Sequence, residues 1–442
     1  MGAYPRNRCG TVGERRPNRL TNVNHNFLGL SAYMGKRAPI LIARKGIEIL
    51  FGLGTFAILA RTLPKEQFAI YSLVFGFIAI LRLTSLPGIG TAVSQAFARS
   101  FPGGFRDAVK ISFTGSLAGS LILLLAAWWH FQNEAFITGQ VLIVTAICFP
   151  LVTGLTFWRN AAAGSERYFR LFVFDGLTSA TKFFGVALCA YMIPGVLFPV
   201  VCASLLAPSL INVIATSDQL RGLSPNADRE RESVVYGVRT TIYQLPSVLA
   251  QQLDKFVLFY FISPEALAVY AVALRIPELS RTVVGETNAT LGPVFAREKE
   301  YTPFLYRFSF KLWLVFLCIS VAGAMLIVPY LLPLLAGTNY SGSVFFAQIM
   351  TVGVALGYLG DIQFRYIKSH LHSQNYLRIT LCSALLNGVL ILSLAYFFGI
   401  VGVVAAYVLK SLGYTVITNA VIRFKYLNSK MSHHMSQEPS QP

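Results

Sequence analysis

The chain has 442 residues, of which 55% are hydrophobic and only 13% are charged, and its mean hydropathy is +0.58. This composition excludes an ordinary soluble protein, which carries far more charged surface. The formal net charge is +18, but a nucleic-acid partner is not expected, because the basic residues are scattered through loops between apolar segments. Apolar runs of about 20 residues recur along the chain, each long enough to cross roughly 30 Å of hydrocarbon as a helix. The sequence therefore predicts an all-α polytopic membrane protein.

A polar, basic segment precedes the first apolar run. It has no apolar signal-peptide core with a cleavage site, so we expect residues 1–38 to form a disordered cytoplasmic tail. Met34, close to the first apolar run, is a candidate for the natural start. Twelve membrane spans are then predicted, at 39–60, 67–87, 108–128, 136–158, 169–191, 195–216, 234–262, 266–290, 308–330, 343–364, 376–397 and 401–422.

Lysine and arginine are concentrated in every second predicted loop. Three or four of them lie in each of the loops 97–110, 159–170, 221–231, 297–311 and 365–378, and in the tail after Ile422. The intervening loops 129–135, 191–194, 263–265, 331–342 and 398–400 hold none, and only Arg61 and Lys65 break the pattern. The positive-inside rule then places both termini in the cytoplasm, which requires an even number of spans.

Two weak internal similarities indicate a duplicated architecture. The segment EQFAIY at residues 66–71 resembles EALAVY at 265–270, and SERYFR at 165–170 resembles SQNYLR at 373–378. Both pairs fall at equivalent places in two six-span halves of the same orientation, as in transporters built from parallel repeats. The predicted units are a tail at 1–38, a first six-helix bundle at 39–216, a linker at 217–233, a second bundle at 234–425 and a polar tail at 426–442.

Charged side chains lie inside several of the apolar spans. Such groups are costly in hydrocarbon, so they usually face a bundle interior or a water-filled cavity. Lys182, Arg275 and Lys410 lie about ten residues from the nearest span end, roughly 15 Å deep, and are the principal candidates for an anionic-substrate path. Further cationic candidates, some of them shallow enough to snorkel, are Arg44, Lys45, Arg82, Arg239, Lys255 and Arg281.

Carboxylates inside the spans offer a second kind of chemistry. Asp175, Asp254, Glu278 and Asp361 are candidates for coupling transport to an ion, although pairing with neighbouring cations explains them equally well. Pro246 and Pro277 interrupt the two central spans and predict bends, which either gating or packing would explain.

Other chemistry has no support in the pattern. The cysteines inside apolar runs have no regular spacing and are expected to pack as small hydrophobic residues. His370 and His372 lack partners at metal-binding spacing. No nucleotide-binding loop and no catalytic constellation is visible, so we expect no cofactor, no metal and no enzymatic activity.

Three segments resemble a known family. Residues 59–71 (LARTLPKEQFAIY) are similar to the ARxLGPxxFGxY signature of polysaccharide-biosynthesis flippases, residues 88–93 (GIGTAV) to their LGxxxA(V/L) element, and residues 252–255 (QLDK) to their QxD(R/K) element. Ala69 replaces the usual glycine, and no glycine stands between Leu63 and Pro64. The likeness extends over nearly all of 39–425.

This resemblance is to O-antigen-type flippases of the multidrug/oligosaccharidyl-lipid/polysaccharide exporter superfamily. It implies two bundles that enclose a cationic cavity and move undecaprenyl-pyrophosphate-linked oligosaccharide across a bacterial inner membrane by alternating access. The implied partners are this substrate, membrane lipids and a glycan polymerase or export machinery. Three alternatives stay open. A multidrug or cation antiporter of the same superfamily is disfavoured by the excess of buried cations, and a membrane glycan polymerase or ligase by the short loop 331–342. A peptidoglycan-precursor flippase is disfavoured because such proteins typically have two additional spans.

Overall fold

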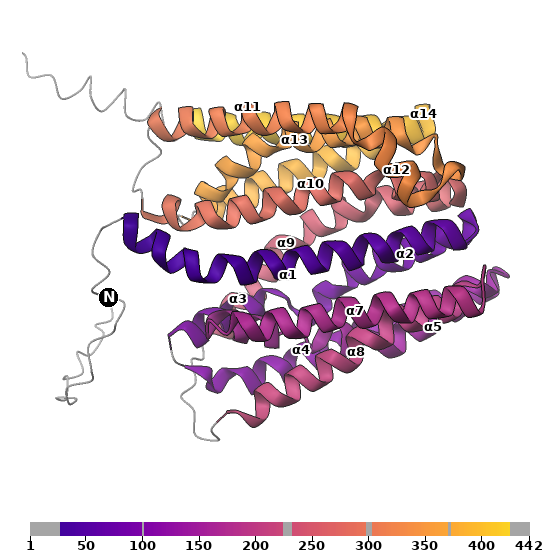
Figure 1. The fold of residues 1–442 in the computed structure, drawn as a ribbon, viewed down its shortest axis with the longest axis horizontal. Coiled ribbons are helices and arrows are strands. Elements are labelled where there is room, and N and C mark those ends of the chain that lie inside the picture. Colours follow the sequence, from indigo (N-terminus) through magenta and orange to yellow (C-terminus); the bar gives the residue numbers. More distant parts are fainter. Residues whose placement is uncertain (1–26, 100, 224–231, 298–302, 370–372, 425–442) are drawn as a thin grey trace, which may run out of the picture.

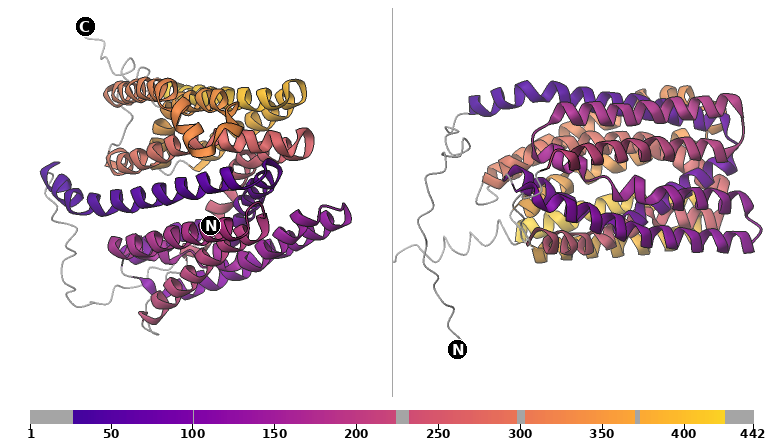
Figure 2. Two further views of the ribbon diagram at one scale, coloured as in Figure 1. Left: turned by 45° about the vertical axis from the view of Figure 1, so that its right-hand side comes forward. Right: turned by 90° about the horizontal axis from the view of Figure 1, so that it is seen from below.

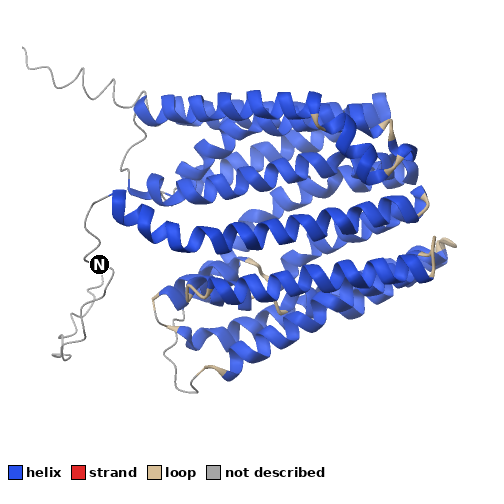
Figure 3. Cartoon of the chain, in the orientation of Figure 1, coloured by secondary structure: helices blue, strands red, loops and turns tan. Residues whose placement is uncertain are grey.

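The computed structural model describes residues 27–99, 101–223, 232–297, 303–369 and 373–424. Throughout these ranges the regular elements are helices, joined by short loops (Figure 3). This confirms the expected all-α class. The basic tail up to residue 26, residues 224–231 of the linker, the H-x-H motif of His370 and His372 and the polar tail lie outside the described residues.

The first half of the chain forms eight α-helices. They are α1 (Phe27–Thr62), α2 (Lys65–Leu81), α3 (Gly88–Ala98), α4 (Phe105–Gln132), α5 (Phe136–Phe149), α6 (Trp158–Gly164), α7 (Tyr168–Met192) and α8 (Leu197–Arg221). Short helical turns cover Arg82–Ser85, Pro102–Gly104 and Pro150–Gly154. The second predicted span, 67–87, thus corresponds to α2 and the turn after it, and the fourth, 136–158, to α5, the turn after it and the first residue of α6.

The second half contributes six more helices and two turns. They are α9 (Glu232–Val257), α10 (Pro264–Arg297), α11 (Pro303–Leu326), α12 (Val328–Ala336), α13 (Ser343–Ser369) and α14 (Ser373–Ile422), with turns at Leu258–Ile262 and Thr338–Tyr340. The long α14 is divided at Gly399, whose φ of 57° is not helical. The predicted loop 398–400 coincides with this break.

Three features differ from the sequence-based expectations. Helix α1 begins at Phe27, so the last twelve residues of the predicted disordered tail 1–38 are helical. Helix α12 lies in and before the predicted loop 331–342, where nine residues are too few to be recognised as a span. Helix α3 lies wholly beyond residue 87, where the second predicted span ends. Helices α9 and α10 continue through Pro246 and Pro277, the positions at which the sequence predicts bends.

Eight helical segments in the described part of the chain are long and apolar enough to cross a membrane. Figure 1 shows the helices running side by side in two bundles, with α3 to α8 on one side and α10 to α14 on the other. Helices α1 and α9 lie between the bundles, and the left view of Figure 2 shows the same separation. We call the end of the molecule near Phe27 the N-terminal end and the opposite end, near Thr62, the far end.

The break between α2 and α3 is fixed by its surroundings. Pro87 has no N–H to donate to the preceding turn, and Leu86 adopts a left-handed conformation with φ of 54°. Gly115 of α4 packs directly against this segment, since a Cβ there would lie 2.2 Å from the carbonyl oxygen of Thr84. The non-helical segment between α2 and α3 therefore needs a glycine on the neighbouring helix α4. The change of direction at this segment turns α3 toward α9.

Candidate functional site

A cavity of about 450 Å³ lies between the two halves, and we call it the central cavity. Helices α1, α2 and α7 of the first half and α9 and α10 of the second half line it. Its charged and aromatic lining residues are Glu48, Phe51, Phe56, Phe68, Tyr71, Phe75, Lys182, Lys255, Arg275 and Glu278. Three cations thus face two carboxylates in a space of the size that binds small ligands.

Two cations of the central cavity reach across the boundary between the halves. The guanidinium of Arg275, on α10, packs against Gly52 of α1, where a Cβ would lie 3.1 Å from its Nη2. The side chain of Lys255, on α9, packs in the same way against Gly76 of α2. Arg275 and Lys255 therefore contact the opposite half, whereas Lys182 lies against Phe75 of its own half, so the charge of the cavity depends on how the halves are placed.

Aromatic rings carry much of the contact made by these cations. The Lys182 ammonium lies 4.9 Å from the centre of the Phe75 ring, and the Arg275 guanidinium carbon lies 5.7 Å from that of Phe56. Arg275 also approaches Glu278, one turn further along α10, with an Nη1 to Oε2 distance of 3.4 Å. A cation held against a ring face keeps its charge available to an anion, because the ring does not neutralise it.

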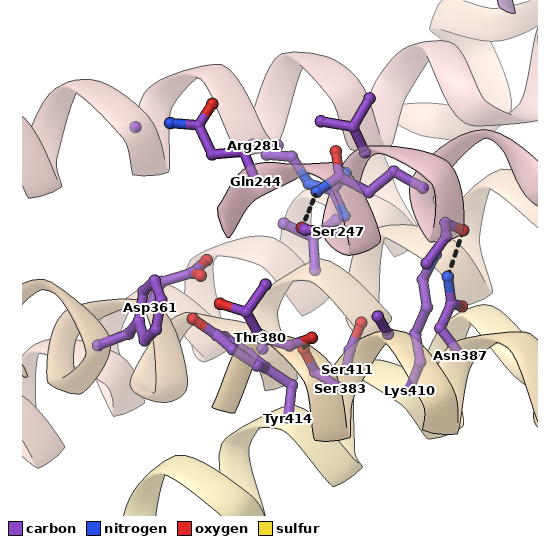
Figure 4. A pocket seen from close by; sticks show the side chains of 18 of the residues that line it. Gln244, Ser247, Arg281, Asp361, Thr380, Ser383, Asn387, Lys410, Ser411 and Tyr414 are labelled. Atoms are coloured by element: carbon purple, nitrogen blue, oxygen red, sulfur yellow. Dashed lines mark hydrogen bonds between the residues drawn. The ribbon is translucent and has the colours of Figure 1, made fainter. Parts of the chain in front are cut away.

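A second cavity of about 560 Å³ lies inside the second half, between α9, α10, α13 and α14, and we call it the second-half pocket (Figure 4). Its polar lining residues are Gln244, Ser247, Gln251, Arg281, Asp361, Arg365, Thr380, Ser383, Asn387, Lys410, Ser411 and Tyr414. Lys410 therefore lies in a different cavity from Lys182 and Arg275. The distance of Lys410 from the end of its predicted span could not show this, because that distance does not specify which face of the helix carries the side chain.

Buried tyrosines organise the charges beside this pocket. The Tyr407 ring lies 4.5 Å from the Lys410 ammonium and 5.6 Å from the Arg281 guanidinium carbon, and its hydroxyl accepts a 3.1 Å hydrogen bond from Arg281. Asp254 is 3% exposed and accepts a 2.5 Å hydrogen bond from the hydroxyl of Tyr270. Asp254 is thus held within the second half and does not line either cavity.

Three other predicted residues, Asp175, Arg44 and Lys45, line neither cavity, although Lys45 contacts the cavity residue Glu48. Asp175 joins Arg44, at 3.0 Å, and Arg159, at 2.7 Å, inside the first half. Arg159 lies on α6, although the sequence assigned it to a loop. Lys45 pairs with Glu48 at 2.9 Å on α1.

Two of the shallower cations are exposed. Arg82 lies in the turn between α2 and α3, and its side chain is exposed. Arg239 is exposed near the start of α9 and donates a 2.6 Å hydrogen bond to the Tyr243 hydroxyl. Neither residue lines the central cavity or the second-half pocket, so neither contributes to their charge through direct contact.

The halves touch on both sides of the central cavity. At the far end Arg61 of α1 donates hydrogen bonds of 2.5 and 3.2 Å to the carbonyls of Leu334 and Leu335, the unpaired C-terminal acceptors of α12. His130 of α4 and Tyr260 of the turn after α9 lie 3.0 Å apart, ring nitrogen to hydroxyl. These contacts close the far end of the boundary.

Toward the N-terminal end, α3 and α9 meet backbone to backbone. The Gly88 amide donates a 3.0 Å hydrogen bond to the Thr241 hydroxyl. A Cβ on Gly88 would lie 2.2 Å from the Gly237 carbonyl oxygen, and one on Gly237 would lie 2.6 Å from the Cα of Ile89. Only glycine at both positions permits this approach.

Sequence reasoning missed several residues that shape these sites. Asn387 and Ser383 lie within an apolar span, and single polar neutral residues there give no pattern to detect. Tyr407 was passed over because tyrosine is common in membrane spans. Among the described residues, no group of three or more His, Cys, Asp or Glu side chains could hold a metal ion.

Comparison with solved structures shows a shared fold. An inward-facing multidrug resistance MATE family transporter of the MOP superfamily matches with a TM-score of 0.69 and 18% identity over 90% of this chain and 99% of that one. The outward-facing structure of such a transporter has a TM-score of 0.62 and 16% identity over 92% and 96%. A MOP superfamily transporter from Pyrococcus furiosus, described for the reverse polarity of its binding pocket, gives 0.62 and 16% over 88% and 95%.

No curated protein matched the chain. The family model for polysaccharide biosynthesis proteins matches residues 35–299, which is more than half of the sequence and includes the first bundle, α9 and α10. The chain therefore belongs to the polysaccharide biosynthesis protein family and has the fold of the MOP superfamily transporters.

Proposed function

We propose that this protein moves undecaprenyl-pyrophosphate-linked oligosaccharide from the inner to the outer leaflet of a bacterial inner membrane. The observation that carries the proposal is the central cavity, where Lys182, Lys255 and Arg275 gather between the two halves. A pyrophosphate is compact and doubly charged, and three cations against two carboxylates leave a net positive site for it. The family match supports a substrate from polysaccharide biosynthesis.

The proposed topology has twelve spans. Eight candidate segments meet the criteria of length and apolarity, and α14 counts as two because Gly399 divides it. Helices α1, α9 and α10 add three more, since each is at least 26 residues long. These three carry charges into the boundary between the bundles, as expected for spans that face a cavity instead of lipid. Both termini then lie on the cytoplasmic side.

Alternating access is the proposed mechanism. The far end is held by Arg61 on the α12 carbonyls and by the His130–Tyr260 contact. Since Arg275 and Lys255 each touch the opposite half, a bound pyrophosphate would change how strongly the halves attract each other. A ligand shifts such an equilibrium only by its differential affinity for the two states.

One observation favours a second candidate, a multidrug antiporter: several solved structures with this fold are MATE transporters. Their identity of 16–18% shows the fold alone. A cationic drug would meet an excess of positive charge in the central cavity. We therefore place the antiporter second.

The test is flipping of a fluorescent undecaprenyl-pyrophosphate-linked oligosaccharide in proteoliposomes. Wild-type protein is expected to flip this lipid and to leave a cationic dye in place. Lys182→Gln and Arg275→Gln are each expected to slow flipping at least tenfold, roughly what loss of one charge-assisted hydrogen bond of 1.5–3 kcal/mol causes. Lys110→Gln, at an exposed position of α4, is the matched control. Dye transport without lipid flipping would replace the proposal with the antiporter.

A further inference from the structure

The second-half pocket adjoins the central cavity along two helices. On α9, Gln251 of the pocket and Lys255 of the cavity are four residues apart, and on α10, Arg281 and Glu278 are three apart. Residues at these spacings are neighbours on one helix face, separated by about one turn of 5.4 Å. The two spaces are thus adjacent, and one extended ligand could occupy both.

The two spaces differ in chemistry. The central cavity is lined by charges and aromatic rings, whereas neutral amides and hydroxyls dominate the second-half pocket, among them Gln244, Ser247, Gln251, Ser383 and Tyr414 (Figure 4). Each of these groups both donates and accepts hydrogen bonds, as sugar hydroxyls do. The volume of about 560 Å³ is within the usual range for ligand sites.

One acceptor in the pocket has no partner. Asn387 is 5% exposed, and its amide nitrogen donates to the carbonyl of Ala250. Its Oδ1 is buried, and no described residue donates to it. A buried acceptor without a donor is costly, and a hydroxyl of a bound ligand would remove that cost.

Neighbouring groups are already positioned for a ligand. The Gln251 amide donates a 3.0 Å hydrogen bond to the Ser247 hydroxyl, one turn earlier on α9. Ser383 donates its own proton to the carbonyl of Thr380, at 3.1 Å, which leaves its hydroxyl oxygen as an acceptor. These bonds fix side chains in place before a ligand arrives, which lowers the entropic cost of binding.

Two polar side chains of the first half, Asp175 and Asn212, have several partners each. There Asp175 is occupied by Arg44 and Arg159. Asn212 accepts from the Trp158 indole and donates to the carbonyls of Leu151 and Val152. Asp175 and Asn212 therefore take part in structural bonds within the first half, whereas Asn387 Oδ1 in the second-half pocket has no donor among the described residues.

We propose that the second-half pocket binds the sugar attached directly to the pyrophosphate, while the central cavity holds the pyrophosphate itself. This inference rests on the proposed function and assigns the recognition of the glycan to one half of the protein. The first sugar is bonded to the phosphate through its anomeric oxygen, so its site must adjoin the phosphate site. Arg281 and Lys410 add positive charge to the pocket, as Lys182, Lys255 and Arg275 do to the cavity, and this favours a phosphate at the boundary against the opposing carboxylate of Glu278.

The experiment measures binding to the full-length protein in lipid nanodiscs. The probes are undecaprenyl pyrophosphate without sugar, and the same lipid bearing a single N-acetylglucosamine, glucose or galactose. For wild-type protein, at least one sugar-bearing lipid is expected to bind about tenfold more tightly than the bare lipid, as a few added hydrogen bonds would give. If no sugar improves binding, the inference is wrong.

Variants of the second-half pocket test whether its side chains cause the tighter binding of the sugar-bearing lipid. In the double variant Gln251→Ala/Ser383→Ala, the dissociation constants of the bare and the sugar-bearing lipid are expected to differ by no more than about twofold. The bare lipid is expected to bind as it does to wild type. Ser393→Ala is the matched control, because Ser393 is exposed on α14 and donates to a backbone carbonyl as Ser383 does. A wild-type ratio in the double variant would overturn the inference.

The proposed function fails in a different way. If wild-type protein binds neither undecaprenyl pyrophosphate nor its sugar-bearing forms better than phosphatidylglycerol, the function itself is wrong. Lys182→Gln is expected to weaken the bare and the sugar-bearing lipid by the same factor, since it acts on the pyrophosphate. Loss of the bare-lipid signal and loss of the sugar-dependent gain are thus separate readouts.

Discussion

Replacing Gly237 by alanine tests the close contact between α3 and α9. The added methyl group would lie 2.6 Å from the Cα and 2.8 Å from the backbone nitrogen of Ile89. Both atoms belong to the backbone, so a rotamer change cannot relieve the clash and the helices must separate. Overpacking of this kind costs about 1–3 kcal/mol. The substitution also gains up to about 1 kcal/mol of helix propensity.

Gly323→Ala supplies the comparison, because a Cβ at this position of α11 meets no atom within 4 Å. It receives the helix-propensity gain without the clash, so the two variants should differ in stability by about 1–3 kcal/mol. Thermal unfolding of the purified variants in detergent at one fixed scan rate measures this difference. At about 2 °C per kcal/mol for a large chain, Gly237→Ala should melt several degrees below Gly323→Ala.

The flipping assay adds a functional readout to the same pair. Gly237→Ala moves α9 relative to the first half and is expected to reduce flipping, whereas Gly323→Ala should leave it near wild type. If Gly237→Ala melts as high as Gly323→Ala, the backbone contact between α3 and α9 is not tight, and the reasoning fails.

Three further substitutions probe other contacts. Asp175→Asn leaves two arginines without their shared carboxylate and should cost roughly 2–3 kcal/mol of stability. This is less than the roughly 3–5 kcal/mol of fully buried pairs, because the Arg159 side chain is 32% exposed. Thermal unfolding measures the loss, and an unchanged melting temperature would contradict it. Arg61→Ala removes both hydrogen bonds to α12, so spin labels on α1 and α12 should report longer distances at the far end; an unaltered distance distribution would count against the closure described. Tyr270→Phe leaves one oxygen of the buried Asp254 carboxylate without its donor and should cost about 1–3 kcal/mol of stability, whereas exposed Tyr396→Phe should cost nothing measurable.

The fold was largely predictable because the membrane restricts what the chain can do. Backbone groups in hydrocarbon must bond within their own helix, so long apolar runs leave one choice of structure. The predicted loop 398–400 therefore falls on the break at Gly399. Helix α12 escaped prediction because the criterion is span length, and a nine-residue helix does not meet it.

The sites were less predictable, because depth along a span does not identify a neighbour. Lys182, Arg275 and Lys410 have similar depth, yet the first two face the boundary between the halves and the third lies inside the second half. Arg159 was counted among loop residues, although α6 carries it into contact with Asp175. Such pairings depend on helix rotation and on contacts between distant segments, which composition and spacing do not record.

Helix α9 is fastened at two places to different parts of the molecule. Its first turns are tied to α3 through Gly237 and Thr241, and its later turns accept the amide of Asn387 at Ala250. Pro246 lies between these attachments and lacks the N–H that would complete the helix there. Any movement of one bundle against the other must therefore bend α9. Pro246 makes the segment between the two attachments the part of the helix that bends most easily.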